Sequence, residues 1–295
     1  MSEGRKVNVR RFFWLVPVLL LAGTVAVSAN PAVKDGYFTT SDGVRLHYLE
    51  AGSGPAIVFV PGWTNPAWIW EPQVRHFSKK YRVVALDPRS QGESEQVTEG
   101  HYPERRAQDV KELMEHLQLP PAVLVGFSMG VGEVLSYVDQ FGTEALRGVV
   151  LVDGRIGSEV NIQKLNEFFG FVKQLNMNRR QWIEQFLPVA FKKPQPEAYL
   201  KRITAASLKV PTNTAIALLA GYWGRDWRPV LEKLDKPVLY TITKPNESQG
   251  EMLKTKLPSA RVELFPEAGH VLFADETDRF NAILEEFAQA CFALR

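Results

Sequence analysis

A serine lies at the centre of the motif Gly-Phe-Ser-Met-Gly at residues 126–130. The apolar run at residues 123–125 predicts a buried strand before it, and the apolar spacing after it predicts a helix beginning at Met129. A serine on so sharp a turn projects its hydroxyl from the edge of a sheet, and the flanking glycines let neighbouring backbone pass close by. We therefore predict that Ser128 is a nucleophile. An ordinary serine helix cap would not need both glycines.

A serine hydroxyl is a weak nucleophile until a base accepts its proton, and the same base can then protonate the leaving group. Four of the five histidines lie in a predicted hairpin, in or near predicted helices, or in a polar loop, where solvation or packing explains them: His47, His76, His101 and His116. His270 alone follows an apolar strand through a short loop, and it comes after the serine in the chain. We expect His270 to be the base.

Strands and helices alternate around these two residues. A hairpin is expected at residues 36–50, with its turn at Asp42-Gly43. Further strands are expected at residues 56–60, 82–86, 123–125, 148–152, 238–242 and 261–265, and helices at 68–81, 103–117 and from 277. This pattern predicts an α/β fold: a mostly parallel, doubly wound sheet of about eight strands within one domain at residues 30–295. In such sheets the site lies at the carboxyl ends of the strands.

The segment between the sixth and seventh predicted strands interrupts this alternation. It is roughly eighty residues long, too long for a structureless loop, and it shows helical periodicity broken by prolines. We interpret it as a helical cap at about residues 155–232, inserted over the strand ends, where it would close the site. The alternative is that these helices only pack on the flank of the domain.

The first 29 residues have the pattern of an export signal. Four basic residues precede an apolar run at residues 12–27, which ends in Val27-Ser28-Ala29. We predict cleavage after Ala29 and a secreted or periplasmic protein. The alternative is an uncleaved anchor, through which alone the chain would contact a membrane.

Charge and composition argue against several other classes of function. The formal charge is +2, with acidic and basic residues interspersed, so nucleic acid is not an expected partner. The single cysteine, Cys291, cannot form an internal disulfide and is expected to be a small buried hydrophobe. The sequence has no zinc, dinucleotide or nucleotide-phosphate motif, so we expect no metal and no cofactor. Nothing in the sequence indicates the oligomeric state.

Four motifs resemble those of the α/β-hydrolase superfamily, over nearly all of the chain after the N-terminal segment. They are Phe59-Val60-Pro61-Gly62-Trp63, residues 86–94, residues 125–130 and Pro266-Glu267-Ala268-Gly269-His270. The pattern is most similar to the small esterase, perhydrolase and non-haem haloperoxidase-like group. The resemblance implies a serine hydrolase that cleaves a small carboxylic ester through an acyl-enzyme. Perhydrolase or haloperoxidase chemistry on the same residues, or ligand binding without catalysis, are the alternatives.

The resemblance also implies an oxyanion hole made of two backbone N–H groups. One belongs to Met129, directly after the nucleophile, and the other to Trp63, in the loop after the third strand. Many relatives have His-Gly where this chain has Pro61-Gly62. Proline removes one backbone donor but leaves that of Trp63, so we expect the hole to be intact.

Two carboxylates remain open as the acid of the triad. The superfamily usually places it after the seventh strand, where this chain has Asn246, and an amide cannot stabilise an imidazolium as a carboxylate does. Glu247 is adjacent and would serve after a one-residue shift of its loop. Asp153 ends the sixth strand, the position from which the dehalogenase branch supplies its acid. We favour Asp153 and keep Glu247 as the alternative.

Aromatic residues are concentrated near the expected site. They suggest an apolar acyl or aryl pocket, although aromatic residues more often simply belong to the core: Trp63, Trp68, Trp70, Phe127, Tyr222 and Trp223.

Overall fold

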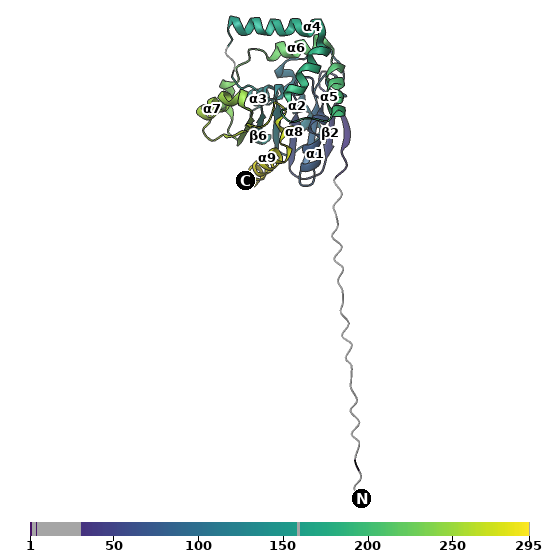
Figure 1. The fold of residues 1–295 in the computed structure, drawn as a ribbon. Coiled ribbons are helices and arrows are strands. Elements are labelled where there is room, and N and C mark those ends of the chain that lie inside the picture. The colour runs from purple at the N-terminus through teal and green to yellow at the C-terminus, as the bar shows by residue number, and fades with distance from the viewer. Residues whose placement is uncertain (2–3, 5–30, 158–159, 295) are drawn as a thin grey trace.

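The computed structural model describes Met1, Gly4 and residues 31–157 and 160–294 (Figure 1). Apart from Met1 and Gly4, the predicted export signal lies outside the described residues. Within them, no single helix has both the length and the apolar character needed to cross a membrane. The helices at Glu197–Lys209 and Thr212–Tyr222 pass that test only as a pair, bent by 86°.

The described chain is built on one eight-stranded sheet with the order β1-β2-β4-β3-β5-β6-β7-β8. The first two strands form the predicted hairpin and pair antiparallel, while β3 to β8 run parallel. The strand bounds are β1 Lys34–Thr39, β2 Arg45–Ala51, β3 Ala56–Val60, β4 Arg82–Asp87, β5 Ala122–Phe127, β6 Leu146–Val152, β7 Val238–Ile242 and β8 Arg261–Leu264. The prediction of a mostly parallel sheet of about eight strands is confirmed.

Two hydrophobic cores lie on opposite faces of the sheet, because successive strand residues point to opposite sides. Val58 packs with α2 and α3 on one face, whereas Ile57 and Phe59 pack with α1, α8 and α9 on the other. The helix bounds are α1 Glu71–Phe77, α2 Pro103–His116, α3 Met129–Phe141, α8 Leu272–Asp275 and α9 Thr277–Ala293. Helices on both faces explain why the central strands are apolar throughout.

The helix predicted at residues 68–81 is shorter and divided. It consists of a 3₁₀ turn, η1 (Ala67–Trp70), followed by α1, which ends at Phe77. Pro72 occupies the first turn of α1, where its missing N–H costs no hydrogen bond, and this marks the boundary between the two elements.

Helices follow the sixth strand, as predicted. Between β6 and β7 the chain forms α4 (Ile162–Ala190), α5 (Glu197–Lys209), α6 (Thr212–Tyr222) and the 3₁₀ helix η2 (Arg228–Lys233). Figure 1 shows α4 and α6 at the top of the molecule, above the helices that flank the sheet. Asn178 leaves helical geometry inside α4, with φ −160° and ψ 76°, so α4 is kinked there.

Candidate active site

The turn between β5 and α3 holds Ser128 in a strained conformation, with φ 54° and ψ −113°. Its N–H donates to the carbonyl oxygen of Val152 at 2.8 Å, which ties the turn to β6. A Cβ on Gly126 would lie 2.3 Å from the carbonyl oxygen of Gly130, and one on Gly130 would lie 2.8 Å from that of Val60. Both glycines are therefore required by close backbone packing.

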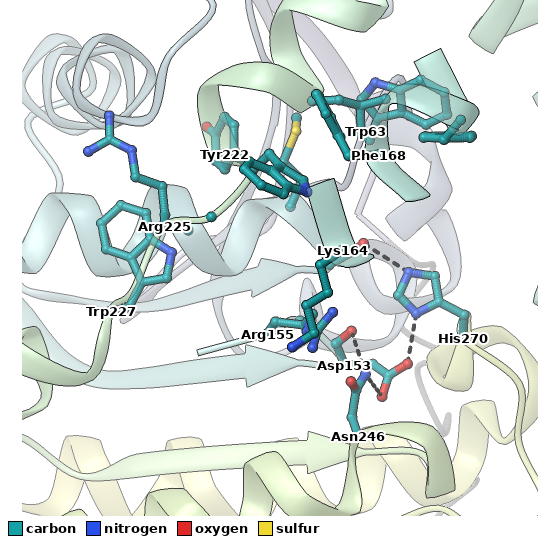
Figure 2. Close-up of a pocket in the computed structure, with 18 of the residues that line it drawn as sticks. Trp63, Asp153, Arg155, Lys164, Phe168, Tyr222, Arg225, Trp227, Asn246 and His270 are labelled. Atoms are coloured by element: carbon teal, nitrogen blue, oxygen red, sulfur yellow. Dashed lines mark hydrogen bonds and ion pairs between the residues drawn. The ribbon is translucent and has the colours of Figure 1, made fainter. Parts of the chain in front are cut away.

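The structure brings Ser128, His270 and Asp153 into one chain of hydrogen bonds, although they come from three distant parts of the sequence. His270 lies in the loop after β8, and its Nε2 is 2.8 Å from Oγ of Ser128. Its Nδ1 is 2.7 Å from Oδ2 of Asp153, as the dashed lines in Figure 2 show. An imidazole that donates from Nδ1 to a carboxylate has Nε2 free to accept the serine proton.

Asp153 directly follows β6 in a left-handed conformation, with φ 45°. Its side chain is buried, and its Oδ1 accepts hydrogen bonds from Thr243 N–H at 2.8 Å, Thr243 Oγ1 at 2.8 Å and Asn246 Nδ2 at 3.0 Å. Burial alone raises the pKa of this carboxyl group, but hydrogen bonds and charge interaction with His270, together with the donors from Asn246 and Thr243, lower it below its usual value. The site thus holds an ionised, fixed carboxylate.

The structure separates the two candidate acids. Glu247 begins α7 (Glu247–Lys256) and its side chain is exposed, whereas Asp153 contacts His270. Asn246 ends η3 (Lys244–Asn246), and its amide donates to Asp153. The residue in the position where the superfamily usually has its acid therefore supports a carboxylate from the neighbouring strand.

Sequence reasoning did not identify Thr243 as part of the site. Its N–H and hydroxyl both donate to the Asp153 carboxylate. The only signal in the sequence was its position directly after the β7 strand, whose carboxyl end lies at the same edge of the sheet as that of β6.

The residues of the expected oxyanion hole lie at the same cavity as the serine and the histidine. Trp63 and Met129 both line it. Met129 is the first residue of α3, and an N–H in the first turn of a helix has no acceptor within that helix. The indole Nε1 of Trp63 donates to the carbonyl oxygen of Ala215 at 2.8 Å, which joins this loop to α6.

A cavity of about 570 Å³ lies between the strand ends and the helices that follow β6. It includes Ser128, and its aromatic wall consists of Trp63, Phe168, Phe171, Tyr222, Trp223 and Trp227. A second cavity of about 40 Å³ shares Trp63 and His270 with the first and is mainly apolar, with Trp182 and Phe186 from α4 among its lining. The site therefore offers one large and one small compartment, and Trp63 and His270 line both.

The aromatic residues singled out from the sequence have different roles. Trp63, Tyr222 and Trp223 line the larger cavity, and Phe127 lines the smaller one. Trp70 is buried in the core, stacked on Phe273 with ring centroids 4.0 Å apart. Trp68 packs against Tyr199 of α5. In residues 31–157 and 160–294, no group of three or more His, Cys, Asp or Glu side chains is placed to hold a metal ion.

Comparisons with known proteins place the chain among enzymes. A sequence model described as "Alpha/beta hydrolase family" matches residues 57–283. A non-heme haloperoxidase from Rhodococcus erythropolis is 29% identical over 275 residues, covering 86% of this chain and 99% of that protein. A bifunctional esterase/perhydrolase from Acinetobacter calcoaceticus is 36% identical over 156 residues, covering 50% of this chain and 56% of that protein.

Solved structures show the same fold. The esterase EaEST from Exiguobacterium antarcticum has a TM-score of 0.80 at 23% identity, covering 86% of this chain and 98% of that one. A bromoperoxidase from Bacillus anthracis has a TM-score of 0.81 at 23% identity, covering 87% and 100%. Residues 57–283 contain the serine turn, the end of β6 and the histidine loop, so the family match and the hydrogen-bonded site concern the same part of the chain. This protein belongs to the alpha/beta hydrolase family.

Proposed function

We propose that the protein is a serine hydrolase that cleaves a carboxylic ester through an acyl-enzyme. The observation that carries this proposal is the unbroken chain of hydrogen bonds from Ser128 through His270 to Asp153. It opens on a cavity large enough for a small organic ester.

Acylation begins when Oγ of Ser128 attacks the ester carbonyl carbon while Nε2 of His270 takes the hydroxyl proton. Asp153 holds the ring and stabilises the imidazolium that forms. The negative charge on the carbonyl oxygen is stabilised by the N–H groups of Trp63 and Met129, each of which contributes about 3 kcal/mol to lowering the barrier. The carbon–oxygen bond to the alcohol then breaks, and His270 gives its proton to the leaving oxygen.

Deacylation repeats these steps with water. His270 takes a proton from a water molecule as its oxygen attacks the acyl carbon, and the proton then returns to Ser128 Oγ as the acid leaves. Hydrogen peroxide in place of water would give a peracid by the same route. That second activity is supported by a relative whose name includes both esterase and perhydrolase and by another named as a haloperoxidase.

The alternative of ligand binding without catalysis is suggested by Asn246, an amide at the position where the superfamily usually has its acid. In the proposed mechanism its amide is a support for Asp153, which supplies the charge. An incomplete triad is therefore no longer an argument for a non-catalytic protein.

A fluorophosphonate probe and a panel of p-nitrophenyl esters of increasing acyl length test the proposal. We expect the probe to label the wild type but not S128A, and the esters to be hydrolysed by the wild type alone. Folded wild-type protein that neither reacts with the probe nor hydrolyses any ester would contradict it. Adding acetate and hydrogen peroxide and measuring peracid tests the second activity.

We also propose that the protein is exported. The support is the order of basic residues, apolar run and small residues in the first 29 positions. Sequencing the N-terminus of the mature protein is the test. A chain that begins at Asn30 would agree, and one that begins at Met1 would contradict cleavage and favour an anchor.

A further inference from the structure

Two basic side chains line the larger cavity and, among the described residues, have no ion-pair or hydrogen-bond partner. Arg155 lies two residues after Asp153, and Lys164 lies in the first turn of α4. Figure 2 shows Lys164 extending from its helix toward Arg155 in the region of Asp153. The third basic residue at this cavity, Arg225, is different because it forms an ion pair with Glu104 at 2.8 Å.

The acidic groups at this cavity are already engaged. Glu167 accepts a hydrogen bond from Gln163 at 3.0 Å. The carboxylate of Asp153 accepts hydrogen bonds from His270, Thr243 and Asn246. Neither acid forms an ion pair with Arg155 or Lys164, so neither of these cations at the cavity has an ion-pair partner among the described residues.

Local structure does not explain the position of Lys164. The N-terminus of a helix carries partial positive charge, so a lysine in the first turn is unfavourable there. The capping of α4 is provided by Asn161, whose Oδ1 accepts from the backbone N–H of Lys164 at 2.9 Å, and any residue except proline at 164 would allow that bond. The half-buried side chain of Lys164 is therefore placed where an anion would stabilise its charge.

We propose that Arg155 and Lys164 bind a carboxylate carried by the substrate, so that the preferred substrates are esters with one free carboxylate group. This inference rests on the proposed ester hydrolysis. A carboxylate that contacts both side chains would lower the repulsion between their like charges. Guanidinium and ammonium groups both form charge-assisted hydrogen bonds with carboxylate oxygens.

In this proposal, different parts of the substrate occupy the two cavities. Ser128, Arg155 and Lys164 all line the larger cavity, so the reacting carbonyl and the carboxylate share that space. The smaller cavity is mainly apolar and includes neither cation. It fits a small uncharged group on the other side of the ester.

Matched pairs of esters test the proposal from both ends of the substrate. On the acyl side, mono-p-nitrophenyl succinate is compared with p-nitrophenyl butyrate, and the glutarate monoester with the valerate. On the alcohol side, 4-acetoxybenzoate is compared with 4-acetoxybenzamide. We expect kcat/KM to favour the anionic member of at least one pair by about tenfold or more, as for one charge-assisted hydrogen bond. Added salt should reduce that preference.

Variants assign the preference to these side chains. K164Q and R155Q should each reduce the ratio of anionic to neutral kcat/KM toward one, K164R should retain it, and K164E should favour the neutral ester. R225Q is the matched control, because its arginine lines the same cavity but is paired with Glu104. No preference for either anionic series, or an equal loss of preference in R225Q, would overturn the proposal.

A binding experiment separates this proposal from the proposed function. Calorimetry of glutarate binding to S128A needs no turnover, and we expect K164Q in that background to weaken binding by about tenfold. If no ester is hydrolysed but glutarate binds through Lys164, the hydrolase proposal fails and the carboxylate site stands. If esters are hydrolysed without any preference and glutarate does not bind, the carboxylate site alone fails.

Discussion

The side-chain amide of Asn246 donates to Oδ1 of Asp153 at 3.0 Å. Asn246 lies at the end of η3, which follows β7, and Asp153 directly follows β6. The two residues thus divide a role that one carboxylate after β7 usually has in this superfamily. Asp153 provides the negative charge beside His270, and Asn246 fixes its orientation.

Replacing Asn246 with aspartate should move the acid limb of the activity profile to higher pH. N246D removes the amide N–H that donates to Asp153 and places a second carboxylate beside the first. The repulsion between the two negative charges raises the pKa of the carboxylate pair. N246A removes only the donor and should move the limb less. The measurement is kcat/KM against pH, and identical profiles for N246D and the wild type would contradict the supporting role.

The acid of the triad can be assigned by two substitutions. D153N should reduce kcat by roughly 10⁴-fold, because an amide cannot stabilise the imidazolium and favours the wrong tautomer of the ring. E247Q should leave kcat close to that of the wild type, since Glu247 is exposed on α7. Both are measured on one p-nitrophenyl ester, with circular dichroism to confirm folding. A large loss in E247Q and none in D153N would reverse the assignment.

His101 should make the protein less stable in mild acid. Burial of the imidazole is the largest cause, followed by the charges of Arg106 and Arg89, and together they lower the pKa of His101 from 6.5 to about 4. Nε2 of His101 lies 3.0 Å from Oγ of Ser90. The unfolded chain therefore takes up this proton at higher pH than the folded one. Its contribution to stability is complete above pH 6.5 and is lost as pH falls toward 4, by on the order of 3 kcal/mol.

Denaturant unfolding at a series of pH values checks this expectation. H101Q should flatten the fall in unfolding free energy between pH 6.5 and 4. H116Q is the control, because it also removes an imidazole but from an exposed position on α2. If H101Q kept the full slope, another group would have to be responsible.

The glycines at the serine turn should tolerate no side chain. G126A would place a Cβ 2.3 Å from a backbone oxygen, and we expect a loss of about 2–3 kcal/mol or more in unfolding free energy, together with loss of activity. G170A is the matched control on α4, where a Cβ meets nothing within 4 Å and alanine favours the helix by up to about 1 kcal/mol. Thermal unfolding of the two variants provides the comparison, and equal stability would be inconsistent with the packing described.

The serine and histidine could be predicted because their signals are local. Five consecutive residues specify the turn at Ser128, and a strand and a short loop specify His270. The parallel part of the sheet could be predicted because its central strands carry their own apolar runs, and the hairpin because of its turn at Asp42-Gly43. The sequence favoured Asp153 as the acid but left Glu247 open, because what distinguishes them is the approach of Asp153, directly after β6, to His270 in the loop after β8.

Other features also depend on tertiary structure. Arg155 and Lys164 are ordinary surface-type residues in the sequence, and only the fold places both at one cavity. Trp70 and Trp63 look alike in the sequence, yet Trp70 is buried against Phe273 whereas Trp63 lines both compartments of the site. The periodicity at residues 68–81 did not reveal the boundary at Pro72.

The acyl-enzyme itself is the central claim. Rapid-quench mass spectrometry of the wild type with p-nitrophenyl acetate should show one acetyl group on the peptide that contains Ser128, formed as fast as the burst of p-nitrophenol and absent from S128A. Ester hydrolysis without acetylation of Ser128, or at an equal rate in S128A, would contradict the mechanism.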